Sequence, residues 1–181
     1  MHRALCYVLL TLCLALAACG SNRAAPSGGA YVGGNVPIEC APFARALTGV
    51  KLSGAAADWW PQAAGRYDRS RDPDVGSVLV FRRGGRLPSG HVAVVSEVVG
   101  PRQIRVTQAN WVRHRITEEQ SVIDVSRSGD WSLVRVFWPP SGEMGTTEYP
   151  TYGFIRPDHP PSKRMIAQRT PDAVKMALAG W

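Results

Sequence analysis

Residues 90–110 read GHVAVVSEVVGPRQIRVTQAN, two Val- and Ile-rich runs separated by Gly100-Pro101-Arg102. Runs of this composition bounded by turn residues indicate β-strands, and so short a connection predicts an antiparallel hairpin. The start of the first strand then lies beside the end of the second. We therefore expect His91 and Asn110 to be neighbours in a sheet built on this hairpin.

A helix that begins with a single cysteine is predicted upstream of the hairpin. Residues 40–48 carry apolar side chains at helical spacing, with Pro42 at an early helical position and Gly49 as the stop residue. Cys40 is the only cysteine after Cys19. A thiol without a disulfide partner in an exported chain points to a chemical role, the alternative being a small buried apolar side chain.

Packing this helix on the hairpin predicts a catalytic trio. Cys40 is the candidate nucleophile, with its pKa lowered below about 8.5 by the helix N-terminus and a nearby imidazolium. His91 is the candidate base, and Asn110 is expected to orient its ring on the sheet face that the helix covers. Gln108 lies on the same strand face and is a candidate auxiliary residue. Asn110 could equally cap a turn.

The remaining elements complete an α+β fold, with N-terminal helices on an antiparallel sheet of about five strands. A short second helix is expected over 55–64, and further strands over 77–81, 113–116 and 133–138. The tryptophans Trp59, Trp60 and Trp111 are candidates for a substrate groove, since aromatic side chains give a large contact area at low entropic cost. The alternative is that two of the three belong to the core.

The N-terminus has the pattern of an export signal. Residues 1–18 combine a short basic start with an apolar run too short for a comfortable membrane span. The sequence LAAC at 16–19 resembles the lipobox of bacterial lipoproteins, which implies acylation of Cys19 and a lipid bilayer as partner. Residues 19–35 are Gly- and Ser-rich, which predicts a flexible linker. The chain is therefore expected to be lipid-anchored in the cell envelope, facing the periplasm or cell wall.

Charge and composition narrow the partners. The formal net charge of +7 suits anionic phospholipid or an anionic cell-wall polymer. Scattered arginines without a basic stripe argue against nucleic acid, and His114 and His159 lack ligand spacing, so no metal or cofactor is expected. The main domain is predicted at 36–140. Residues 141–181 are expected to be a Pro-rich tail, with a helix from about Thr170 that is a candidate site for a protein partner.

Four motifs together resemble the CHAP domain, the cysteine, histidine-dependent amidohydrolase/peptidase family. They are ECAPFAR at 39–45, PDVGSV at 73–78, GHVAVV at 90–95 and QANW at 108–111. The resemblance implies a papain-like fold and hydrolysis of an amide bond in peptidoglycan, either between the glycan and the stem peptide or within the peptide. Cys40 and His91 match the family's nucleophile and base.

The resemblance also bears on the third residue of the trio. Some family members carry Glu two residues before the position of Asn110, where this chain has the uncharged Gln108. We therefore expect Asn110 to orient the histidine, and the imidazolium to be less stabilised than in those members. Two alternatives use the same domain: a catalytically silent cell-wall-binding or scaffold module that recruits an active hydrolase, and a thiol acyltransferase.

Overall fold

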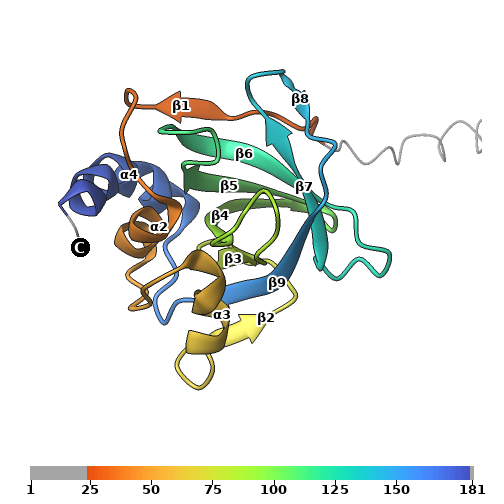
Figure 1. Ribbon diagram of the computed structural model, residues 1–181, viewed down its shortest axis with the longest axis horizontal. Coiled ribbons are helices and arrows are strands. Elements are labelled where there is room, and N and C mark those ends of the chain that lie inside the picture. The colour runs from red at the N-terminus through yellow and green to blue at the C-terminus, as the bar shows by residue number, and fades with distance from the viewer. Residues whose placement is uncertain (1–23, 180–181) are drawn as a thin grey trace, which may run out of the picture.

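The computed structural model describes residues 24–179, which form an antiparallel sheet covered on one side by helices (Figure 1). The described strands are β1 (Ala30–Val32), β2 (Asp68–Ser70), β3 (Val78–Phe81), β4 (His91–Gly100), β5 (Gln103–Ala109), β6 (Ile116–Asp124), β7 (Leu133–Trp138), β8 (Glu143–Met144) and β9 (Tyr149–Arg156). The described helices are α2 (Cys40–Thr48), the 3₁₀ turn η2 (Ala56–Asp58), α3 (Trp59–Gln62) and α4 (Lys163–Leu178).

Six of these strands close into a barrel. The pairings run β6–β5–β4–β3–β9–β7, and β7 pairs back onto β6. Along β4, Ala93 and Val95 belong to one buried cluster and Val92 and Val94 to another, as expected when side chains alternate across a strand. The first cluster fills the barrel, and the second lies outside it, beneath the helices.

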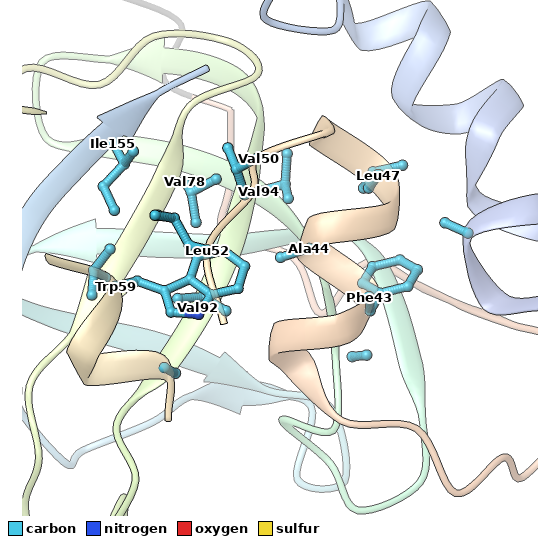
Figure 2. Close-up of a cluster of buried hydrophobic side chains, with 14 of the residues drawn as sticks. Phe43, Ala44, Leu47, Val50, Leu52, Trp59, Val78, Val92, Val94 and Ile155 are labelled. Atoms are coloured by element: carbon cyan, nitrogen blue, oxygen red, sulfur yellow. The ribbon is translucent and has the colours of Figure 1, made fainter. Parts of the chain in front are cut away.

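Helix α2 packs on the outer cluster. Phe43, Ala44 and Leu47 are buried and belong to the same cluster as Val92 and Val94 of β4. Figure 2 shows Ala44 on the side of α2 that faces Val94, and Phe43 and Leu47 on the side away from it. Helix α4 lies beside α2 (Figure 1). The predicted α+β class, with N-terminal helices on an antiparallel sheet, is confirmed.

The central hairpin and the strands around 78–81 and 133–138 form where they were predicted. The strand predicted over 113–116 is wrong, because the chain reverses there: Asn110 and His114 both have left-handed φ values, of 61° and 59°. Strand β6 begins only at Ile116. The sheet therefore has nine described strands instead of about five.

The segment expected to be a linker over 19–35 belongs in part to the sheet. Ser27 exchanges hydrogen bonds with Ser121, and β1 pairs with residues 116–118 of β6. The Val36 amide donates to the His114 carbonyl oxygen. A flexible tether would therefore have to end before Ser27. The predicted signal peptide and Cys19 lie outside the described residues.

The segment expected to be a tail over 141–181 is also part of the fold. Strand β9 pairs with β3 in the barrel wall, and α4 begins at Lys163 instead of Thr170. The Ser162 side chain caps this helix by accepting from the Met165 amide at 3.3 Å. Pro171 lies inside α4, where the packing of a buried face outweighs its missing N–H.

Candidate active site

Helix α2 presents Cys40 at its first turn. Glu39 occupies the N-cap position in an extended conformation without a side-chain cap hydrogen bond, so Cys40 is the first helical residue. The Cys40 residue is partly exposed, and its thiol forms no disulfide. Cys40 lines a cleft of about 570 Å³ together with Glu39, His91, Asn110 and the loop before β4. The structure thus brings the predicted nucleophile and base to one cleft.

His91 opens strand β4 at the mouth of the barrel. It lies opposite Phe81 of β3, and only 4% of its surface is exposed. Its ring packs edge-on against Phe81 and Trp111, with ring centroids 5.5 Å and 5.1 Å away. By strand alternation His91 belongs to the barrel face with Ala93, whereas α2 covers the opposite face. The expectation that His91 sits on the face covered by the helix is therefore wrong, and His91 shares the cleft with Cys40 at the end of β4.

The hydrogen-bond partner of His91 is Gln108 instead of Asn110. His91 Nε2 lies 2.8 Å from Gln108 Oε1, both groups being buried. Strand β5 ends at Ala109, and the left-handed φ of Asn110 turns its side chain away from the strand face. The Asn110 amide donates to Glu39 Oε2 at 2.9 Å, and its Oδ1 accepts from the His114 amide at 2.9 Å. Asn110 thus caps a turn and ties it to α2.

Burial keeps both reacting groups neutral. It raises the pKa of the Cys40 thiol from its ordinary value of 9.0 to about 11. Backbone hydrogen bonds, chiefly at Val92, lower this pKa in part, and the negative charge of Glu39 raises it further. Burial also lowers the pKa of His91 from 6.5 to about 4, although Gln108 and Glu39 oppose the shift. The predicted thiolate is therefore not the resting form. The site holds a thiol and an imidazole at neutral pH.

The position of the ring allows His91 to act as a general base toward the thiol. With Nε2 engaged by Gln108, Nδ1 is the ring nitrogen available to accept a proton. A neutral imidazole can take the thiol proton as the sulfur attacks a carbonyl carbon, so a preformed thiolate is not required.

The three candidate tryptophans have different positions. Trp59 is fully buried in the outer cluster, so its predicted role in a substrate groove is wrong (Figure 2). Trp60 stacks on Tyr152 at 5.8 Å and under the Arg69 guanidinium, and it does not line the Cys40 cleft. Trp111 packs on His91 and lines a neighbouring cleft.

A second cleft of about 460 Å³ adjoins the first. The two share Arg86, Leu87 and Asn110 in their linings, and Trp111, Trp138 and Tyr149 add aromatic surface to the second. Sequence reasoning missed Arg86 and Glu39 as site residues. Glu39 could have been found from its position directly before Cys40. No motif around Arg86 in the sequence indicates a role in the site. Within residues 24–179, no group of three His, Cys, Asp or Glu side chains could hold a metal ion.

Residues 30–110 match the family model of the CHAP domain. The match includes Cys40, His91, Gln108 and Asn110, so over these residues the chain is similar to a CHAP domain. Such a domain implies an amidase or peptidase that acts on peptidoglycan, and hydrolases of the family are generally cysteine enzymes. No curated protein matches the chain.

Proposed function

We propose that this protein is a cysteine hydrolase that cleaves an amide bond of peptidoglycan through Cys40, His91 and Gln108. The observation that carries the proposal is the shared cleft: Cys40 and His91 line it together, and His91 is held by its hydrogen bond to Gln108. A silent binding module would need neither a free thiol nor an imidazole with one ring nitrogen left unengaged.

The reaction follows from the neutral pair. His91 Nδ1 takes the proton from the Cys40 thiol while the sulfur forms a bond to the carbonyl carbon. The imidazolium then protonates the leaving amine as the C–N bond breaks, which leaves a thioester. Water, deprotonated by His91, attacks the thioester, releases a carboxylic acid and restores the thiol. The low pKa of His91 makes its imidazolium a strong proton donor for the amine.

Charge and aromatic surface in the clefts support a cell-wall substrate. Arg86 lies where the two clefts meet, and a guanidinium pairs well with the carboxylates that stem peptides carry. Trp138 and Tyr149 offer flat apolar contact to a sugar or a peptide. The proposal covers both the glycan–peptide bond and a bond within the peptide.

We also propose that the chain is anchored in the bacterial envelope through an acylated Cys19. The support is the sequence at residues 1–19 and the net charge of +7. Within residues 24–179, no helix has the length and apolarity to cross a membrane. The anchor and its acyl chains would then hold the barrel close to the membrane surface.

Digestion of purified peptidoglycan tests the catalytic proposal. Mass spectrometry of the products should show new chain ends: freed lactyl carboxyls and released intact stem peptides for an amidase, or shortened stem peptides for an endopeptidase. The Cys40→Ser variant should form no new ends while melting at the temperature of the wild type, because the change removes a nucleophile and almost no volume. Hydrolysis by that variant, or wild-type binding without new ends, would contradict the proposal.

A further inference from the structure

A chain of buried amides runs from His91 through the barrel. Gln108 Nε2 donates to Gln120 Oε1 at 2.8 Å, and Gln120 Nε2 donates to the Phe137 carbonyl oxygen at 2.7 Å. Gln108 and Gln120 are 1% and 0% exposed and stand on strands that line an apolar interior. Polar groups in such a place are costly unless each one is paired.

The last acceptor of this hydrogen-bonded series of amides determines how each amide group is oriented. The Phe137 carbonyl can only accept a hydrogen bond, so Gln120 must turn its NH₂ group toward it. Gln120 Oε1 then faces Gln108, so Gln108 must donate a hydrogen bond to it through its own NH₂ group. Gln108 Oε1 is left facing His91 Nε2, and only a protonated Nε2 can pair with it. The carbonyl of β7 thereby dictates which nitrogen of His91 carries the proton.

A β-bulge makes this chain possible. Val106 pairs with Gln120 and Gln108 pairs with Thr117, so residues 118 and 119 together face Thr107. Glu119 takes the extra position with φ 57°. Without it, residues 117 and 120 would point to opposite faces of β6, and Gln120 could not share the barrel face with Gln108.

The bulge is held from outside by helix α4. Lys163 Nζ lies 2.8 Å from Glu119 Oε2 and 2.5 Å from Glu97 Oε2. Arg105 contributes a further pair with Glu97 at 3.2 Å. The segment that positions Gln120 is therefore tied both to the neighbouring strands and to the C-terminal helix.

We propose that Gln120 is a positioning residue that fixes His91 in the Nε2–H tautomer, which leaves Nδ1 free to accept the Cys40 proton. The assignment of Nδ1 as the base rests on the proposed function; the assignment of the tautomer does not. Reversing the tautomer requires both amides to flip, which would set Gln120 Oε1 against the Phe137 carbonyl with two acceptors facing each other.

Imidazole ¹⁵N NMR of the full chain at pH 7 tests the tautomer without substrate. The wild type should show a protonated Nε2 and an unprotonated Nδ1, with the signals of His91 assigned by their loss in His91→Ala. In Gln120→Met, a similar shape with neither donor nor acceptor, Gln108 is free to rotate and both tautomers should appear. Gln120→Glu keeps an acceptor toward Gln108 in either charge state, so it should retain the wild-type tautomer.

Thr117→Val is the matched control. Thr117 is buried on the same strand opposite Gln108, and its hydroxyl has no hydrogen-bond partner in the described part of the chain. The His91 tautomer signal of Thr117→Val should therefore match that of the wild type. In hydrolysis assays Gln120→Met should lower kcat about twofold if both tautomers are equally populated, and more if the Nδ1–H form dominates, with KM unchanged.

The outcomes separate the two proposals. A wild-type proton on Nδ1, or a pure Nε2–H signal in Gln120→Met, would overturn the role of Gln120. The wild-type spectrum and Gln120→Glu keep the test valid if the Met variant does not fold. If the tautomers change as expected but the wild type cuts no peptidoglycan, the positioning role stands and the proposed function fails.

Discussion

The most direct consequence of the buried site is a slow thiol. With a pKa of about 11, Cys40 would be thiolate in only about 10⁻⁴ of molecules at pH 7, against about 1% for a cysteine with the ordinary pKa of 9.0. Since the thiolate is the form that reacts, alkylation of Cys40 by iodoacetamide should be roughly 100-fold slower in the folded protein than in urea. The predicted rate rises tenfold per pH unit until about pH 11.

The Glu39→Gln variant tests the electrostatic part of this argument. Glu39 raises the pKa of Cys40, so removal of its charge should lower that pKa and speed alkylation at pH 7. Glutamine still offers an oxygen to the Asn110 amide, which keeps the contact between α2 and the turn. Glu148→Gln makes the same chemical change at a carboxylate paired with Arg135 outside the Cys40 cleft, and it should leave the rate unchanged.

The assay is the rate at which the Cys40 peptide gains the alkyl group, followed by mass spectrometry from pH 5 to 12. A folded protein that labels as fast as the unfolded chain, or a rate that levels off below pH 8, would refute the reasoning. Either result would mean that Cys40 and His91 rest as a thiolate–imidazolium pair.

Two further predictions concern His91 and the residue before it. Between pH 7 and pH 4, the free energy of unfolding of the wild type should fall by roughly 3 kcal/mol more than that of His91→Gln. The reason is that His91 binds a proton below about pH 6.5 in the unfolded chain but only below about pH 4 in the folded protein. Equal falls in urea titrations of both proteins would contradict this. Gly90→Ala should cost roughly 1 to 3 kcal/mol in thermal melts, since Gly90 has φ 72° and a Cβ there would lie 2.6 Å from the Ala57 Cβ. Gly85→Ala, in the same loop with open space around it, is the control, and a matching loss there would show that the close approach does not matter.

The features that the sequence predicted correctly are local ones. The hairpin over 90–110 and the helix at Cys40 follow from composition, periodicity and stop signals within short windows. The residues that meet at the cleft were predicted by pairing these two elements. The strands that pair over long range were missed. Strand β9 was predicted as part of the tail because Pro150 and the prolines after it obscure the strand pattern. Strand β1 was predicted as linker because a Gly-rich edge strand has no apolar alternation.

The third residue of the site was mistaken for a different physical reason. Gln108 and Asn110 lie on the same face of an ideal strand, and composition alone does not separate them. One backbone angle at Asn110 ends the strand and leaves Gln108 beside His91. The bulge at Glu119 likewise turns Gln120 inward through a single left-handed residue. Such angles depend on the tertiary structure. Asn tolerates them more readily than most residues, which is why a turn was the alternative for Asn110, whereas nothing about Glu119 marks its angle in the sequence.

The uncharged side chains of Gln108 and Gln120 are consistent with a His91 that is neutral. His91 stands at the mouth of a barrel whose interior is apolar, where a carboxylate at position 108 would be costly to bury. A glutamate there would also present only acceptors to Gln120, which would have to flip and place its own oxygen against the Phe137 carbonyl. Residues 108 and 120 are therefore coupled choices. With both as glutamine, every amide in the chain is paired, Nε2 keeps its proton, and the base stays neutral without a buried charge.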